Sequence, residues 1–405
     1  MRALWAGTRD RALELRPSII LPALGLLLLL VFGLGGAMQR DPSHIDMDVF
    51  YGAGTWYLEG VSPYGELRTP PRLEPLGIHM KAYGYAPHFA PFTIALATLD
   101  YRTARIAWTA VNLLAAAALA AVIVALMYDD PARVRTDPLA ARVTAFLVLG
   151  SPFAATVMWL GNTSIIVAAC LSAAWWLDRR KQPLAAGVLL ALALIKPQFA
   201  LLPLLWLVGE RRWATLAVCA ATCAVLFAYH AVTFGPVESI RDWIAGVMVY
   251  QATERPPGFE HIFGIAELVR AAGFPPPPVW LLAIPLVAAA WIWRQRQTAL
   301  ESLAILCAVA ALLLPIRDYD LIILAPLVGA IAAQARGSLA ASATALIAVV
   351  LLYLPQRTFR GFDSPIILQW RVLVVLLMLG YLAMLIARRA GVPGAAERLG
   401  LSSRA

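Results

Sequence analysis

Long apolar runs, separated by short polar or charged stretches, fill most of the chain between residues 18 and 387. A helix that crosses a bilayer needs about 20 mostly apolar residues, and many of these runs approach that length. The pattern therefore predicts an all-α polytopic membrane protein, a bundle of about 11–13 hydrophobic helices. The runs are 18–38, 86–99, 104–127, 143–160, 163–177, 183–208, 213–234, 279–293, 300–314, 321–335, 339–354 and 366–387.

Composition agrees with this pattern and argues against a soluble domain and against a nucleic-acid-binding protein. Hydrophobic residues make up 61% of the chain and charged residues 14%, whereas soluble domains carry about 25% charged residues. The mean hydropathy is +0.73. A net charge of +9 would suit a nucleic-acid-binding protein, but Lys and Arg stand in short clusters at the ends of the apolar runs. These clusters are typical of topology signals, so we expect membrane lipids and no nucleic acid as partners.

The same clusters predict which side of the membrane each polar stretch faces. Four arginines before the first run indicate a cytoplasmic N-terminus, and the C-terminus is expected on the same side. With the run 183–208 counted as two pieces, there are thirteen hydrophobic pieces. Two cytoplasmic termini need an even number of crossings, so one piece, expected to be the short run 86–99, is re-entrant or not a separate span. The sequence predicts a single integral membrane domain over 1–405. Its polar segments are 39–85 (first external loop), 235–278 (second external loop) and 388–405 (cytoplasmic tail).

The run 183–208 carries basic residues at both ends and a charged break in its middle. Arg179-Arg180-Lys181 precede it, Arg211-Arg212 follow it, and Ile195-Lys196-Pro197-Gln198 interrupt it. Two basic flanks around one run predict a broken or re-entrant hairpin rather than one crossing. Because Lys196 would then lie at membrane depth, it should line a protein-enclosed polar cavity, and it becomes a candidate functional residue.

Two carboxylates, Asp46 and Asp48, lie close together in the polar stretch after the first run. A carboxylate in this place can act as a general base toward an acceptor hydroxyl, provided that partial burial adjusts its pKa. Two other interpretations remain open. Asp41 or Asp46 could cap a short interfacial helix over 49–58, or Asp46 and Asp48 could bind a divalent cation together with His44. The pattern gives a metal little support, and no metal site is predicted.

A second polar cluster, from Arg317 to Asp320, interrupts the apolar pattern near the C-terminal third of the chain. Arg317 could rest against lipid headgroups. Alternatively, Arg317 and Lys196 could bind a lipid-linked phosphate, since Arg offers a bidentate fork and Lys a point charge. No Walker motif, Gly-rich phosphate loop or Gly-x-Ser-x-Gly elbow is present, so the sequence does not support a nucleotide-driven enzyme or pump.

Taken in order, these pieces resemble the membrane glycosyltransferases of the GT-C superfamily. The resemblance is closest to family 87, which includes polyprenol-phosphate-mannose-dependent mannosyltransferases and arabinofuranosyltransferases. It extends from the first apolar run to about Pro326. The matching motifs are Asp46-Met47-Asp48-Val49-Phe50-Tyr51, Gly60-Val61-Ser62-Pro63-Tyr64, Tyr85-Ala86-Pro87, Gly161-Asn162, Ala186-Gly187, Lys196-Pro197 and 315–319.

The resemblance implies an inverting transfer of mannose or an arabinofuranose-like sugar from a polyprenyl-phosphate donor to a glycolipid or glycan hydroxyl. It implies a bacterial inner-membrane enzyme with its active site on the external face and no required cofactor. Asp46 maps onto the family's base and Asp48 ranks second, while Lys196 and Arg317 would hold the donor phosphate. The expected sugar- and acceptor-binding residues are Tyr51, Tyr64, Tyr85, His88, Asn162, Gln198, His261, Asp318, Tyr319 and Asp320.

The chain departs from the family pattern in two places. Gly161-Asn162 stands where members often read Gly-Gln, and Arg317-Asp318-Tyr319 stands where members carry a Ser-Trp-His-like cluster. These departures leave the donor sugar open. A transporter or flippase of lipid-linked sugars is the alternative. Transporters commonly contain an internal repeat, however, and no second copy of the Asp46 or Lys196 motif is found.

Overall fold

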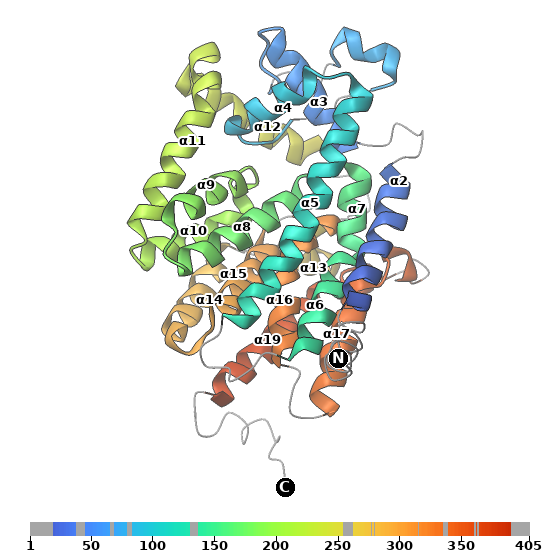
Figure 1. Cartoon of the computed structure of the whole chain (residues 1–405), viewed down its shortest axis with the longest axis vertical. Coiled ribbons are helices and arrows are strands. Elements are labelled where there is room, and N and C mark those ends of the chain that lie inside the picture. The colour runs from blue at the N-terminus through green and yellow to red at the C-terminus, as the bar shows by residue number, and fades with distance from the viewer. Residues whose placement is uncertain are drawn as a thin grey trace, which may run out of the picture. The chain divides into compact units, whose positions relative to one another are not determined.

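The computed structural model describes residues 19–37, 45–64, 69–78, 83–129, 137–253, 262–276, 278, 280–314, 316–334, 339–359, 362 and 364–389. Within these ranges the protein is almost entirely helical (Figure 1). The strands among the described residues are β1 (Ile262–Phe263) and β2 (Ile316–Arg317), which pair antiparallel. The predicted all-α membrane fold is confirmed.

Four helices are long and apolar enough to cross a membrane: Tyr101–Tyr128, Pro138–Leu160, Trp213–Phe234 and Trp370–Arg388. Shorter apolar helices accompany them, beginning with Ile19–Leu34. The α-helices are α2 (Gly35–Ala37), α3 (Ile45–Leu58), α4 (Ala90–Ala97), α5 (Tyr101–Tyr128), α6 (Pro138–Leu149), α7 (Pro152–Leu160), α8 (Ser164–Arg179), α9 (Pro183–Ala193), α10 (Pro197–Gly209), α11 (Trp213–Phe234), α12 (Pro236–Thr253), α13 (Ile265–Ala271), α14 (Trp280–Ile292), α15 (Ala299–Leu313), α16 (Ala325–Gln334), α17 (Leu339–Tyr353), α18 (Pro365–Leu368) and α19 (Trp370–Arg389).

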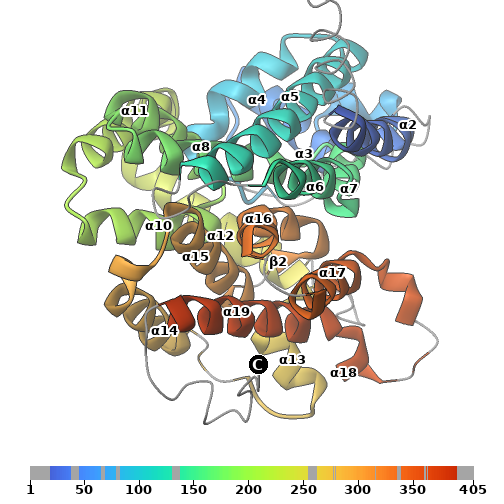
Figure 2. The same cartoon turned by 60° about the horizontal axis from the view of Figure 1, so that its bottom comes forward.

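The chain divides into two compact units. The first unit comprises Leu26–Val122 and Leu149–Phe259, and the second comprises Met1–Gly25, Ile123–Val148 and Glu260–Ala405. In the second unit α15 is buried along nearly its whole length between α14, α16 and α19. Figure 2 shows α17 beside α19 in the same unit.

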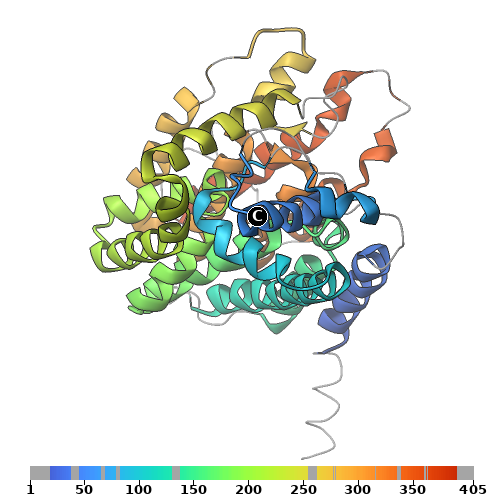
Figure 3. The same cartoon turned by 90° about the horizontal axis from the view of Figure 1, so that it is seen from above.

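Helix α3 lies in the first unit and is longer and more buried than the sequence predicts. The expected helix 49–58 begins at Ile45, so both acids lie inside its first turn. It packs against α4 (Figures 1 and 3). At the contact, a Cβ added to Gly54 would come within 2.0 Å of the Thr93 carbonyl oxygen, so the crossing requires glycine. Helix α4 has eight residues and rises about 12 Å, too little to cross a core about 30 Å thick.

The run 183–208 forms the predicted hairpin. Its two arms, α9 and α10, have 11 and 13 residues, and each is shorter than a membrane span. Lys196 lies at the break, because the residue before a proline is disfavoured in a helix and Pro197 starts the next one.

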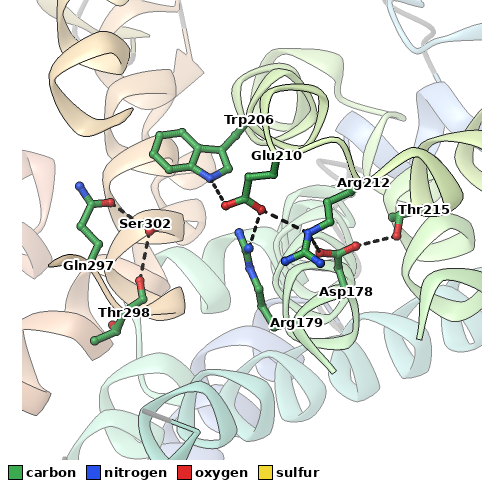
Figure 4. Close-up of polar contacts among 9 residues, drawn as sticks. All are labelled: Asp178, Arg179, Trp206, Glu210, Arg212, Thr215, Gln297, Thr298 and Ser302. Carbon is green, nitrogen blue, oxygen red and sulfur yellow. Dashed lines mark hydrogen bonds and ion pairs between the residues drawn. The ribbon is translucent and has the colours of Figure 1, made fainter. Parts of the chain in front are cut away.

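Charged side chains join the two ends of this hairpin (Figure 4). Arg179 donates to Glu210 at 2.5 Å, and Arg212 lies 3.3 Å from Asp178 and 3.5 Å from Glu210. Two further groups donate hydrogen bonds to these acids: the Trp206 indole, 2.8 Å from Glu210, and the Thr215 hydroxyl, 2.6 Å from Asp178. The chain therefore enters and leaves the hairpin at the same place.

Two other regions, the apolar run 143–160 and the polar segment 235–278, differ from the sequence-based prediction. The run 143–160 begins at Pro138 and is divided into α6 and α7 at Ser151, whose side chain accepts from the Phe153 amide. The segment 235–278, predicted to be the second external loop, contains α12, which starts directly after α11, and α13.

Candidate active site

The helical start of α3 sends the two acids in different directions. In a helix, residues two apart lie on different faces. Asp46 is half-buried and its Oδ2 accepts from the Asn162 amide nitrogen at 2.9 Å. Asp48 is buried and accepts a hydrogen bond from the Tyr101 hydroxyl. Position near the helix N-terminus suits both carboxylates, because the helix dipole favours negative charge there.

Gly161 brings Asn162 to Asp46. It ends α7 in the left-handed conformation, with φ of +65°. A Cβ at this position would also lie 2.8 Å from the Cβ of Met47, the neighbour of Asp46. Its carbonyl oxygen accepts from the Trp108 indole at 2.6 Å. Glycine at 161 thus permits both the turn and the close approach of α7 to α3.

Lys196 holds the other end of the Asn162 side chain. Its ammonium lies 2.9 Å from Asn162 Oδ1 and 2.7 Å from the Ser164 hydroxyl oxygen. Ser164 contributes its backbone N–H, 2.8 Å from the same Oδ1, and its hydroxyl, 2.5 Å away. Because these donors all meet Oδ1, the Asn162 amide can present only its N–H groups to Asp46. The buried Lys196 and the acid are therefore connected through one side chain.

Aromatic rings surround the hydrogen-bond network of Asp46, Asn162 and Lys196. Lys196 Nζ lies 5.9 Å from the centroid of the Tyr85 ring and 5.9 Å from that of Phe199. The Tyr85 hydroxyl lies 3.4 Å from the Asn162 amide nitrogen, and its ring meets Phe50 edge-on at 4.8 Å. These rings replace water around the ammonium while their faces attract its charge, which offsets part of the cost of burying Lys196.

Two of the other tyrosines expected to bind sugar, Tyr51 and Tyr64, make hydrogen bonds within the protein. Tyr51 donates to the Leu99 carbonyl at 2.7 Å, and Tyr64 donates to the Tyr85 carbonyl at 2.6 Å. Burial raises the pKa of both hydroxyls above the ordinary value. They remain protonated donors at neutral pH, and in this structure they fix the segments around Tyr85 and Leu99.

Three further predicted residues have different outcomes. His88 is buried, and its Nε2 has no hydrogen-bond partner among the described residues. Gln198 is the second residue of α10, partly exposed and close in sequence to Lys196. His261 and His44 lie outside the described residues, and so does Pro315.

The cluster from Arg317 to Asp320 belongs to the second unit. The Arg317 backbone N–H donates to Asp320 Oδ2 at 3.1 Å. Asp318 forms an ion pair of 2.8 Å with Arg371, whose guanidinium also donates to the Leu354 carbonyl at 2.6 Å. Tyr319 lies between these acids in a 3₁₀-helix. The charge of Asp318 is therefore balanced inside its own unit.

Comparison with known proteins identifies the enzyme class. The model of glycosyltransferase family 87 matches residues 83–315, more than half of the chain. The chain belongs to glycosyltransferase family 87. No curated protein matches it. The matched segment contains Tyr85, Asn162 and Lys196, whereas Asp46 and Arg317 lie outside it.

The structure adds partners to this candidate site that the sequence pattern does not single out. Ser164 binds both Asn162 and Lys196, Tyr101 binds Asp48, and Trp108 binds Gly161. Ser164 carries a weak signal, since it lies two residues after Asn162 and starts a helix. The other two lie in an ordinary apolar helix, where only the fold shows their role.

Proposed function

We propose that this glycosyltransferase moves a sugar with inversion from a polyprenyl-phosphate donor to a hydroxyl of a glycolipid or glycan, on the outer face of the membrane. Asp46 is the general base. The observation that carries this assignment is the chain from Asp46 through Asn162 to Lys196. It connects a half-buried carboxylate and a buried cation in one hydrogen-bond network. Sugar transfer from a lipid phosphate needs a base for the acceptor hydroxyl and a positive charge for the leaving phosphate.

The proposed reaction is a single displacement. The acceptor hydroxyl gives its proton to the Asp46 carboxylate, and its oxygen forms a bond to the anomeric carbon of the donor. The bond from that carbon to the phosphate oxygen breaks, and the electron pair leaves with the polyprenyl phosphate. The positive charge of Lys196 stabilises the phosphate as it leaves. Since one carboxylate acts at the reacting carbon, the reaction differs from the two-carboxylate retaining hydrolysis of glycosidases.

In this proposal Asn162 positions the acid. Its amide orientation is determined by Lys196 and Ser164, so its N–H holds one oxygen of Asp46 in a defined place. Such positioning matters because a displacement of about 1 Å can lower a rate about 100-fold. Arg317 remains a proposed phosphate-binding residue. Tyr85, His88, Gln198, Tyr319 and Asp320 remain proposed sugar- or acceptor-binding residues.

The decisive test compares Asp46→Asn with Asp48→Asn in a sugar-transfer assay on purified protein in lipid vesicles. Loss of a general base costs about 10²–10⁴-fold in rate, and we expect Asp46→Asn to fall in this range. Asp48→Asn should retain much more activity, because Asp48 is bound to Tyr101. Normal turnover by a folded Asp46→Asn protein would disprove the base assignment.

A second test separates the roles of Lys196 and Ser164. Lys196→Ala removes the charge, whereas Ser164→Ala removes only a hydroxyl that binds it. We expect Lys196→Ala to reduce kcat/KM for the donor at least about 100-fold and Ser164→Ala about 10-fold, in line with the loss of charged and neutral hydrogen bonds. Equal losses in the two variants would leave Lys196 with a positioning role alone.

The donor sugar is proposed to be mannose or an arabinofuranose-like pentose, and both should be offered as polyprenyl phosphates. The same vesicles can also distinguish a lipid-linked-sugar flippase. A transferase forms product when donor and acceptor share one leaflet, whereas a flippase only moves donor across the bilayer. Translocation without product would favour the flippase.

A further inference from the structure

A second charged region lies at the far end of α8 from the proposed active site. It consists of the two turns that the ion pairs of Figure 4 join, Arg180–Gln182 between α8 and α9 and Glu210–Arg212 between α10 and α11. We call them the basic turns. Helix α8 has 16 residues and is about 24 Å long, so the basic turns are well separated from Asn162 at its start.

The charges of the basic turns and of the adjoining end of α8 do not cancel. Asp178 and Glu210 are bound by Arg179 and Arg212. Burial alone would raise the pKa of Glu210, but the hydrogen bond and charge of Arg179 lower it below its ordinary value, so the acid stays ionised. Three other cations of the region are exposed to solvent: Arg180, Lys181 and Arg211. These ion pairs thus do not involve Lys181 and Arg211, which lie exposed on turns that the pairs hold together.

Two of these cations adopt a conformation that glycine would adopt with less strain. Lys181 and Arg211 each have φ of 59°, and no other non-glycine residue that the structure describes has positive φ. Both follow the end of a helix. The Lys181 N–H donates to the Asp178 carbonyl at 2.9 Å, and the Arg211 N–H donates to the Val208 carbonyl at 3.0 Å. Glycine is the favoured residue at this position, because side chains strain the left-handed conformation. A cation at both positions indicates that the charge itself has a use.

Apolar side chains next to the basic turns indicate what the charge meets. Leu184, Leu205, Val208 and Trp213 lie within a few residues of the turns and are exposed. In a membrane protein, such side chains contact lipid tails, and cations beside them lie at the level of the headgroups. The Arg180 guanidinium is further held over the Trp176 ring, 4.5 Å from its centroid.

We propose that Arg180, Lys181 and Arg211 form a binding site for the headgroup phosphate of an anionic membrane phospholipid. The site is distinct from the proposed donor-phosphate residue Lys196, which lies toward the other end of the hairpin arms. Its occupant would tie the α8–α11 group to the membrane surface through charge, in addition to apolar contact.

The test uses the full-length protein in phosphatidylcholine bilayers with increasing phosphatidylglycerol, and reads lipid binding by native mass spectrometry and stability by thermal melting. The double variant Lys181→Gly/Arg211→Gly removes two charges while it relieves both strained backbones. Without phosphatidylglycerol it should melt at the wild-type temperature or higher. Its affinity for phosphatidylglycerol should fall about fivefold per lost cation, or about 25-fold in all.

The control variant is Arg241→Gln, which removes an exposed charge on α12, beyond the other end of α11. It should bind phosphatidylglycerol as the wild type does. If the glycine variant fails to fold, Lys181→Asn/Arg211→Asn replaces it, since Asn is neutral and tolerates the left-handed conformation. Wild-type binding by the folded double variant, or an equal loss in Arg241→Gln, would overturn the site. Competition by millimolar inorganic phosphate would overturn the assignment to lipid.

Discussion

Asp46 and Asp48 show how far an identical side chain depends on its surroundings. They are two residues apart in one helix turn. Asp46 accepts a hydrogen bond from the Asn162 amide, which is itself hydrogen-bonded to the buried Lys196, whereas Asp48 accepts one from a tyrosine hydroxyl. The difference follows from the helical start at Ile45. In an extended segment, residues two apart would share a face and could act as a pair.

At the same scale, Gly161→Ala should disturb the proposed site without touching a polar group. The left-handed φ would strain alanine, and the new Cβ would lie 2.8 Å from that of Met47. We expect a loss of stability of about 2–4 kcal/mol, about 1 from the backbone and the rest from overpacking. Transfer activity should fall with it. The measurement is thermal unfolding alongside the transfer assay.

Gly60→Ala is the matched control. Gly60 also has a positive φ, +72°, but nothing lies within 4 Å of an added Cβ. It should lose only the backbone contribution and keep its activity. If both variants behave alike, then the contact with Met47 has no importance for the site.

At the scale of elements, the hairpin of α9 and α10 depends on a proline at its tip and on charges at its ends. Pro197 separates the arms and leaves Lys196 outside both helices. Arg179, Arg212 and their acids hold the two ends together. Helix α9 also packs closely on α11, where a Cβ at Gly187 would lie 2.5 Å from the Val218 side chain. Lys196 therefore lies at the tip of a hairpin whose two ends are joined by ion pairs.

The stability of the folded protein should depend on pH through the ion pairs of Glu210. The folded protein lowers the pKa of Glu210 below its ordinary value of 4.5. The stability that this shift provides is therefore present at neutral pH, and it is lost as the pH falls below about 4.5 through the lowered pKa. Glu210→Gln should melt at a lower temperature at pH 7, and the difference from wild type should shrink at pH 3–4.

Glu59→Gln is a suitable control for this measurement. Glu59 is exposed and pairs with Arg72 only at 3.7 Å, and such surface pairs contribute little. Its melting temperature should follow the wild type across the same pH range. A pH-independent deficit in Glu210→Gln would show that lost packing, and not charge, explains the change.

At the scale of the whole molecule, the proposed reaction on the outer face makes a claim about topology. Val61, after α3, and Gln182, in a basic turn, are both exposed. Cysteine introduced at each, in a chain whose four native cysteines are replaced, can be labelled with a membrane-impermeant maleimide. Val61→Cys should react in intact cells, and Gln182→Cys only after permeabilisation. Labelling of Gln182→Cys in intact cells would invert the proposed orientation.

The sequence alone was sufficient to predict the membrane class, the helical fold and the hairpin. The apolar runs, their basic flanks and Pro197 each affect only the residues next to them. Their structural effect can therefore be predicted without knowledge of tertiary contacts. The sequence also named Asp46, Asn162 and Lys196 as candidates. Their contact could be seen only in the folded chain, because these three residues are up to 150 positions apart and come together through the packing of α3, α7, α8 and α10.

The structure also decided where other polar groups are used. Tyr51, Tyr64 and Asp318 have the side chains of a sugar site, yet each has a partner inside the protein. Arg371 and Tyr101 had no distinguishing pattern in their apolar helices, and both bind acids. Periodicity tells which face of a helix is apolar, but a hydrogen bond depends on distances of a few tenths of an ångström, which only the packed chain defines.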